Sequence, residues 1–187
     1  MGTIEDRRVQ RTKELLRSSM LELLKEKPIG KITPTELCRR ANINRNTFYA
    51  HYRSPEELLD SIEDELFRRI QPLVGQRKEG DEAWGPLAGI LQIFTQEQPL
   101  LQILCSENSG GHFQTWVSDL CHDIVLRDLH EKGLAVDQPW EEHIHLFSLM
   151  GSSAVITEWI RGGMKESPEE VSDFILKICD TGFAGFL

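Results

Sequence analysis

Residues 32–58, with the sequence ITPTELCRRANINRNTFYAHYRSPEEL, decide the fold that we expect. The run Thr33-Pro34-Thr35-Glu36 is a helix start: a capping side chain, a proline suited to the first turn and a glutamate that closes a capping box. About two turns later stands Asn42, a residue that tolerates the left-handed backbone of a tight turn. Asn44 can cap a further short helix that runs to about Tyr52. The stretch therefore predicts two short helices joined by a tight turn.

Longer amphipathic helices are predicted on both sides of this stretch. The first covers about residues 6–26 and ends before Pro28 and Gly30, and its apolar stripe is formed by Leu16, Met20, Leu23 and Leu24. Another begins at Ser54-Pro55-Glu56-Glu57 and runs to about Val74, with an apolar face of Leu58, Leu59, Ile62, Leu66 and Ile70. Two short helices held by longer ones form a helix-turn-helix, whose second short helix can enter the major groove of DNA.

The rest of the chain also has helical periodicity. Helices are predicted over about residues 83–96, after Pro99, over 112–131 and 140–160, and from Ser167 onward, with a polar loop at 76–82. The fold class is therefore all-α, with about nine helices. We expect an N-terminal helix-turn-helix DNA-binding domain at residues 1–53 and a second helical domain at residues 54–187, linked by the helix that starts at 54.

Charge is distributed unevenly along the sequence. Residues 1–53 hold 12 Lys and Arg against 6 Asp and Glu, a net of +6, whereas residues 54–187 carry a net of −15. A polyanion such as DNA should therefore meet only the N-terminal part. The sequence has no apolar run long enough for a membrane span and no secretory signal, so we expect a cytoplasmic protein. The four cysteines are widely spaced and are expected to be buried thiols.

The predicted recognition helix carries side chains suited to a groove. Phe48 and Tyr52 lie one turn apart and should face the core, which turns Asn46, Thr47 and Ala50 outward. Asn and Thr can contact base edges, and an alanine can meet a thymine methyl group. Phosphate contacts are better suited to the flanking side chains: Arg45, Tyr49, His51 and Arg53.

Residues 32–58 resemble the DNA-binding domain of the tetracycline-repressor (TetR) family. With the flanking helices included, the resemblance covers about residues 7–70. The resemblance implies a homodimer that binds a near-palindromic operator in double-stranded DNA. It also implies that residues 54–187 form the regulatory and dimerisation domain. It places DNA contacts at Thr33, Thr35, Arg45, Asn46, Thr47, Tyr49 and His51, and we expect Asn44 and Arg53 to contact DNA as well. Asn42 departs from the glycine that the family usually has. Pro55 stands where the family often has a phosphate-binding lysine, a contact that Arg53 could replace.

The C-terminal part contains candidates for an effector pocket. Apolar side chains from separate helices, with two histidines as polar anchors, form the candidate lining: Phe94, Leu104, His112, Phe113, Trp116, Leu120, His143 and Phe147. The alternative interpretation is that they simply fill the core. No metal-ligand spacing, phosphate-binding loop or nucleophile elbow is present, so we expect neither a metal, nor a cofactor, nor an enzyme.

Two functions remain open from the sequence. The first is a homodimeric repressor whose operator binding a small-molecule effector modulates. The second is a coactivator or regulator that is controlled by a partner protein. The dimer seam is expected along about Trp140 to Ile160 and Val171 to Phe183, because Gly151-Ser152-Ser153-Ala154 would let a helix approach closely.

Overall fold

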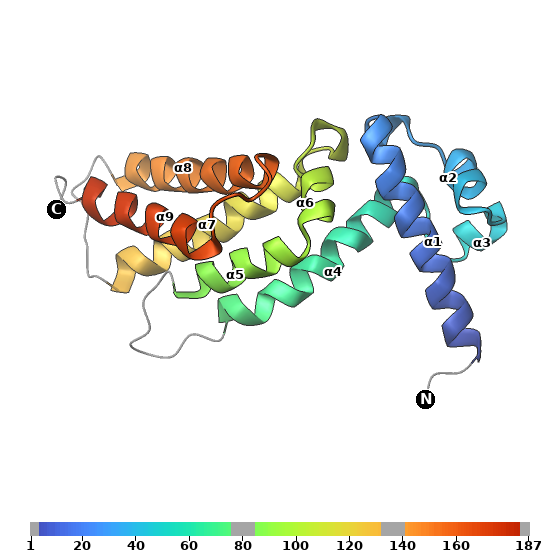
Figure 1. Ribbon diagram of the computed structural model, residues 1–187, viewed down its shortest axis with the longest axis horizontal. Coiled ribbons are helices and arrows are strands. Elements are labelled where there is room, and N and C mark those ends of the chain that lie inside the picture. The colour runs from blue at the N-terminus through green and yellow to red at the C-terminus, as the bar shows by residue number, and fades with distance from the viewer. Residues whose placement is uncertain (1–3, 76–84, 132–140, 184–187) are drawn as a thin grey trace. The chain divides into compact units, whose positions relative to one another are not determined.

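The computed structural model describes residues 4–75, 85–131 and 141–183, and within these ranges it is all-α, with nine α-helices and no strand (Figure 1). The chain divides into two units, which we call the head (residues 1–69 and 106–110) and the body (residues 70–105 and 111–187). Among the described helices, none combines the length and the apolar character needed to cross a membrane. The expected fold class is confirmed. The functional division at residues 53 and 54 stays a prediction.

The head contains α1 (Ile4–Glu26), α2 (Pro34–Ala41), α3 (Arg45–Tyr49) and the first part of α4 (Pro55–Gly75). In Figure 1, α2 and α3 follow one another beside α1. The predicted stripes form its core, since these side chains are at most 9% exposed: Leu16, Met20, Leu23, Leu24, Leu37, Phe48, Tyr52, Leu58 and Ile62. Two short 3-10 turns, η1 (Ile29–Lys31) and η2 (Glu107–Ser109), complete the head.

The body contains five helices beside the end of α4. They are α5 (Gly85–Gln96), α6 (Gln98–Leu104), α7 (His112–Glu131), α8 (Glu141–Arg161) and α9 (Pro168–Phe183). Helix α7 packs along α8, and α9 packs on both α5 and α8. The predicted loop at 76–82 and Trp140, the start of the predicted seam, lie outside the described residues.

Capping explains where several helices begin. The Thr33 side chain accepts the Glu36 N–H at 3.3 Å, as predicted, but the Glu36 carboxylate pairs with Lys27. Ser167 and Glu170 form a reciprocal capping box at 2.8 and 3.1 Å, which holds the pKa of Glu170 below its ordinary value. Helix α3 ends at Tyr49 rather than near Tyr52, because the His51 N–H turns back to the Phe48 carbonyl in a tighter final turn.

Candidate nucleic-acid interface

The turn between α2 and α3 is fixed by its backbone. Asn42 has φ 53° and ψ 45°, the left-handed conformation that the sequence predicted. The Asn42 N–H donates to the Arg39 carbonyl, and the Ile43 N–H donates to the Cys38 carbonyl at 3.0 Å. These bonds satisfy carbonyls at the end of α2 and set the direction in which α3 leaves.

Helix α3 is oriented by one cap and two buried aromatic rings. The Asn44 side chain accepts the Asn46 N–H at 2.8 Å, so Asn44 acts in the structure as the helix cap. Phe48 is fully buried and Tyr52 is 9% exposed, with ring centroids 6.1 Å apart. Because these rings face the core, the opposite side of this short helix is presented to solvent.

The side chains predicted to contact DNA lie at the head surface. On α3 and the turn after it, Thr47 and His51 are half-buried and the other predicted contacts are exposed: Arg45, Asn46, Tyr49 and Arg53. Ala50 is exposed as well, and Thr33 and Thr35 are exposed at the N-terminal end of α2. The structure therefore brings the predicted contacts together on two neighbouring helices, at an exposed and polar surface of the kind that can enter a major groove.

Arg45 and Tyr49 form a pair on α3. The Arg45 guanidinium donates to the Tyr49 hydroxyl at 3.3 Å, and its Cζ lies 5.7 Å from the centre of the Tyr49 ring. The hydrogen bond to Tyr49 raises the pKa of Arg45 above its ordinary value. Phe48 supports the Tyr49 ring edge-on at 5.4 Å between centroids. The pair presents an oriented cation beside Asn46 and Thr47, the side chains predicted to face the groove, and such a cation suits a phosphate contact.

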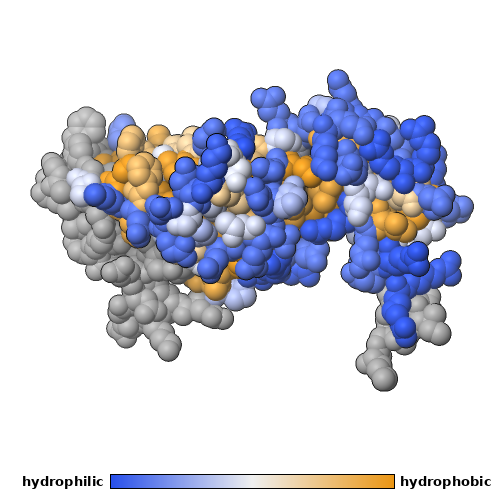
Figure 2. All heavy atoms as spheres, in the orientation of Figure 1, coloured by the Kyte–Doolittle hydropathy of each residue, from blue (hydrophilic) through white to orange (hydrophobic). Residues whose placement is uncertain are grey.

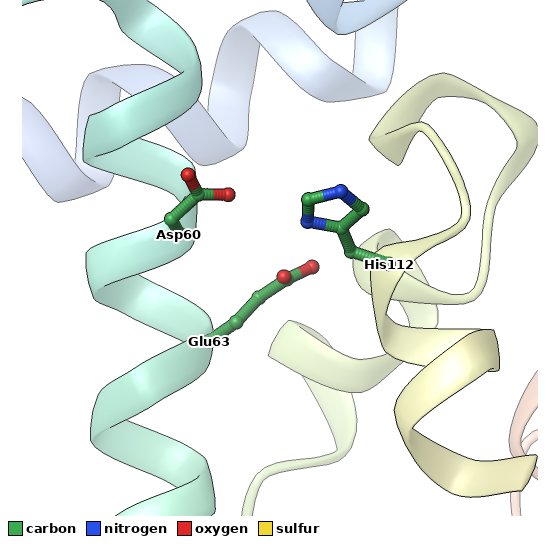
Figure 3. Close-up of side chains that lie close together, drawn as sticks. All are labelled: Asp60, Glu63 and His112. Atoms are coloured by element: carbon green, nitrogen blue, oxygen red, sulfur yellow. The ribbon is translucent and has the colours of Figure 1, made fainter. Parts of the chain in front are cut away.

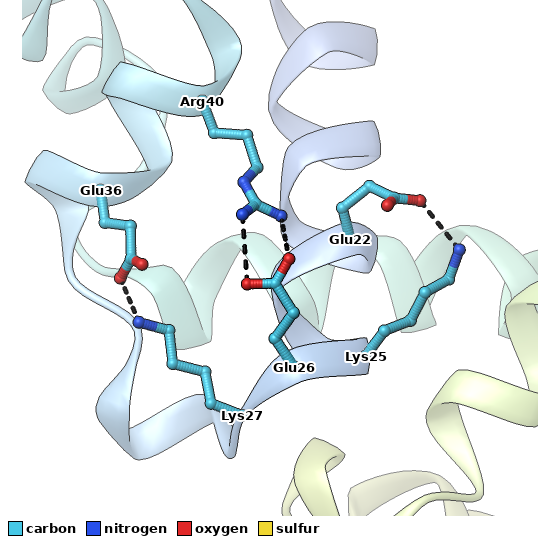
Figure 4. A network of polar contacts seen from close by, with 6 residues as sticks. All are labelled: Glu22, Lys25, Glu26, Lys27, Glu36 and Arg40. Carbon is cyan, nitrogen blue, oxygen red and sulfur yellow. Dashed lines mark hydrogen bonds and ion pairs between the residues drawn. The ribbon is translucent and has the colours of Figure 1, made fainter.

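A set of ion pairs that sequence reasoning missed links α1 to α2 (Figure 4). Arg40 on α2 donates to both carboxylate oxygens of Glu26, at 2.7 and 3.1 Å. Lys27 pairs with Glu36 one turn earlier on α2. Ion pairs at or near the surface add about 1 kcal/mol or less each, so the main effect of these two pairs is on the orientation of α2. No local sequence pattern predicts these ion pairs, because the two partners of each pair lie on different segments of the chain, 9 or 14 positions apart.

The structure brings together three of the predicted effector-pocket residues in the body. The rings of Phe94, Phe113 and Trp116 lie 5.8 to 6.4 Å apart, and both phenylalanines are fully buried. Leu104 and Leu120 are buried as well. These residues form an apolar core between α5, α6 and α7.

The other pocket candidates lie elsewhere. Phe147 is 66% exposed on α8 and lines a hollow with Phe174 of α9. His143 is exposed on α8. His112 is exposed as the first residue of α7 in the body. Asp60 and Glu63, which belong to the head, project from one face of α4 (Figure 3).

Helices α8 and α9 share an exposed apolar surface, which we call the α8/α9 surface. Its members are 43 to 66% exposed although they are large and hydrophobic: Leu146, Phe147, Met150, Phe174 and Ile178. Figure 2 shows hydrophobic side chains gathered over these helices. Beside them runs a hollow at Gly151, where an added Cβ would meet nothing within 4 Å. Clustered exposed apolar side chains of this kind are typical of surfaces that another protein covers.

Comparison with known proteins supports one family. The model of the TetR-type transcriptional regulator C-terminal region (TetR_C_8) matches residues 84–181, just over half of the chain. The Bacillus subtilis (strain 168) protein "Uncharacterized HTH-type transcriptional regulator YxbF" is 47% identical over 58 residues, which are 30% of this chain and 15% of that protein. The match thus spans well under two thirds of that relative's length.

Solved structures share the whole fold. A TetR transcriptional regulator from Streptococcus agalactiae 2603V is 26% identical with a TM-score of 0.68, and the match covers 94% of this chain and 97% of that one. The regulator FadR from Bacillus subtilis, solved in complex with stearoyl-CoA, has the same fold at 13% identity and a TM-score of 0.56, over 90% and 98% of the two chains. With the helix-turn-helix geometry and the match over the body, these findings show that the chain belongs to the TetR family of transcriptional regulators.

Proposed function

We propose that this protein is a homodimeric repressor that binds a near-palindromic operator through α3. The observation that carries the proposal is the α2–turn–α3 unit, which exposes Asn46 and Ala50, and part of Thr47, within residues 1–53, whose net charge is +6. Asn46 and Thr47 are assigned to base edges, and Arg45 with Tyr49 to phosphates.

The experiment is a fluorescence-anisotropy titration of the full chain with two duplexes: the region upstream of its own gene and a scrambled duplex of equal length. Thr47→Ala should narrow the difference between the two affinities by about 1–3 kcal/mol, because a base contact is lost. Arg45→Ala should weaken both affinities alike, because a phosphate contact carries no sequence information.

Lys165→Ala is the matched control, since Lys165 is an exposed cation of the body. It should leave both affinities unchanged. If the wild-type chain shows no affinity for either duplex at low salt, the repressor proposal fails. If Thr47→Ala weakens both affinities equally, Thr47 is a phosphate contact and the assignment of base readout to it is wrong.

The α8/α9 surface supports the dimer part of the proposal. A second copy related by a two-fold axis would cover the apolar side chains of both chains at once, since each copy presents the same patch. The open space at Gly151 leaves room for a partner helix to approach. Two-fold pairing would also supply two recognition helices, as a near-palindromic operator requires.

Control by an effector is proposed for the body. The buried rings of Phe94 and Phe113, with Trp116 beside them, form an apolar cluster between α5 and α7 that a ligand entering the body would contact. The net charge of −15 over residues 54–187 favours a neutral or cationic ligand over an anion. A ligand that releases DNA from the wild-type chain should also change the intensity of the chain's tryptophan fluorescence, because Trp116 lies beside the two rings. The same ligand should produce neither effect in the Phe113→Ala variant. A ligand that releases DNA equally well from Phe113→Ala acts at another site.

A further inference from the structure

The C-terminal end of α1 contains a carbonyl that lacks its helical donor. In an α-helix the Leu24 carbonyl would accept from the N–H of residue 28, but residue 28 is a proline and has none. The preceding bond, from the Lys27 N–H to the Leu23 carbonyl, is present at 3.0 Å. Leu24 is fully buried, so its carbonyl needs another donor.

Asn108 supplies this donor from a distant part of the sequence. Its Nδ2 lies 2.8 Å from the Leu24 carbonyl oxygen. The surrounding segment is anchored in the head: Ser109 is 3% exposed and donates to the Ser106 carbonyl at 3.0 Å. Gly110 has φ +89°, and a Cβ there would lie 3.4 Å from Ile29. Residues 106–110 are therefore fitted closely against the end of α1.

The body holds the residue immediately before this segment. Cys105, at the C-terminal end of α6, is fully buried, and its carbonyl accepts the Arg161 Nε–H at 2.9 Å. Arg161 is the last residue of α8. The chain passes from body to head at the Cys105–Ser106 peptide, so the crossing is held by a side-chain hydrogen bond on each side.

We propose that Asn108 is a positioning residue: it replaces the donor missing at Pro28 and, with Arg161, makes the 105–110 segment a tie that carries the state of the body to α1. The inference rests on the proposed regulation of the head by the body. The coupling ends at the α2–turn–α3 unit, because the end of α1 is paired with α2 (Figure 4). Glu26, the last residue of α1, pairs with Arg40. Lys27, the next residue, pairs with Glu36. A displacement at Arg161 would reach α2 through this tie.

Hydrogen–deuterium exchange of the full chain, without DNA or effector, tests the tie. Asn108→Ala should speed exchange in peptides over residues 24–32 by about 2- to 10-fold, the range that one lost hydrogen bond corresponds to. Arg161→Gln should speed exchange in the same head peptides about 2-fold or more, and it should add nothing once Asn108 is alanine. Pro28→Ala should restore protection to Asn108→Ala, because residue 28 then has an N–H for the Leu24 carbonyl.

Gln98→Ala is the matched control. Gln98 Nε2 donates to the Gly163 carbonyl at 3.0 Å, so this variant also breaks a side-chain-to-backbone bond near the end of α8, away from Cys105. It should leave the head peptides unchanged. The tie is refuted if Arg161→Gln leaves them unchanged too, or speeds them equally with and without Asn108.

Failure of the tie and failure of the proposed function are distinguishable, because DNA affinity is measured separately on the same proteins. If Asn108→Ala does not fold by circular dichroism, the comparison of Arg161→Gln with Gln98→Ala still decides the question.

Discussion

Asn42 is the residue on which the geometry of the recognition unit turns. Its φ of 53° lies in the region that non-glycine residues avoid, and asparagine is among the few that adopt it at little cost. Thr33 and Asn44 then cap the helices on either side. These three positions could be interpreted from the sequence alone, because each acts on backbone within a few residues of itself.

The first prediction at this scale concerns Asn42. Asn42→Gly should leave the free energy of unfolding unchanged or raise it slightly, because glycine adopts a positive φ without strain. Asn42→Ala should lower the free energy of unfolding by about 1 kcal/mol, because alanine is strained in the left-handed region and cannot make the local hydrogen bonds that favour asparagine there. Urea unfolding of both variants measures the difference. Equal midpoints for Gly and Ala would mean that the turn relaxes out of the left-handed conformation.

A second prediction concerns the buried thiols. Burial raises the pKa of Cys105 to about 12, and burial together with the nearby Cys179 raises that of Cys121 to about 12. In the unfolded chain these thiols ionise near pH 9, so ionisation above pH 9 favours the unfolded state. Stability is therefore fully present below pH 9 and falls between pH 9 and 12, by about 1 kcal/mol per thiol at pH 10.

Urea unfolding at pH 8 and pH 10 measures this loss, and Cys105→Ala should reduce it by the share of one thiol. Comparing the two pH values within each variant removes the constant cost of the cavity that alanine leaves. An identical loss in wild type and Cys105→Ala would show that Cys105 does not contribute to the pH dependence.

At the scale of elements, the sequence predicts where helices begin better than it predicts which side of a helix faces the core. Proline and capping residues indicated the beginnings of α2, α4 and α9, because capping is a local interaction. Helix α8 is apolar on more than one side: Ile144 is buried, while Leu146 and Phe147 are more than half exposed. Periodicity does not tell which side of such a helix faces the core. The sequence therefore groups Phe147 with Phe94 and Phe113, whereas the structure places it on the α8/α9 surface, apart from those buried rings.

Contacts between distant elements were also beyond the sequence. The bond from Asn108 to Leu24 joins residues 84 positions apart, and Arg40 reaches Glu26 across 14 positions. Nothing in the neighbourhood of either residue indicates its partner. The recognition surface could be predicted because it lies on one continuous stretch, whereas the contacts that hold that surface in place come from elsewhere in the chain.

The α8/α9 surface gives the prediction at the scale of elements. The wild-type chain should have twice its 21.4 kDa mass in light scattering at micromolar concentration. Phe147→Ser with Phe174→Ser should give the monomer, because each buried phenylalanine contributes about 1.5–3 kcal/mol and two-fold symmetry counts each substitution twice. Both side chains are more than half exposed in the single chain, so its own unfolding should change little.

Leu15→Ser is the control for this experiment, since Leu15 is 41% exposed on α1 of the head, outside the surface. It should leave the dimer intact. A double serine variant that still has twice the chain mass would place the dimer interface on another face.

At the scale of the whole molecule, the net charge differs in sign between the N-terminal segment and the rest of the chain. Residues 1–53 have a net charge of +6, and residues 54–187 have a net of −15. The acidic part should repel DNA, which confines binding to the basic segment that carries α2 and α3 and discourages non-specific contact by the rest of the chain. A protein of net charge −9 can therefore bind a polyanion.

This separation makes the salt dependence of binding diagnostic. Each phosphate that the basic residues neutralise releases counterions, so the logarithm of the association constant should fall with the logarithm of salt concentration by about 0.9 per phosphate. Arg45→Ala should reduce the steepness of that line by about 1, because one phosphate contact is lost. Thr47→Ala should leave the slope unchanged, since a neutral side chain releases no counterion. Anisotropy titrations on the scrambled duplex between about 50 and 300 mM KCl provide the three slopes.

If the line is flat for the wild-type chain, binding does not depend on phosphate neutralisation by the basic segment. If Arg45→Ala and Thr47→Ala change the slope equally, the division of α3 into a phosphate-contacting pair and base-reading side chains is wrong.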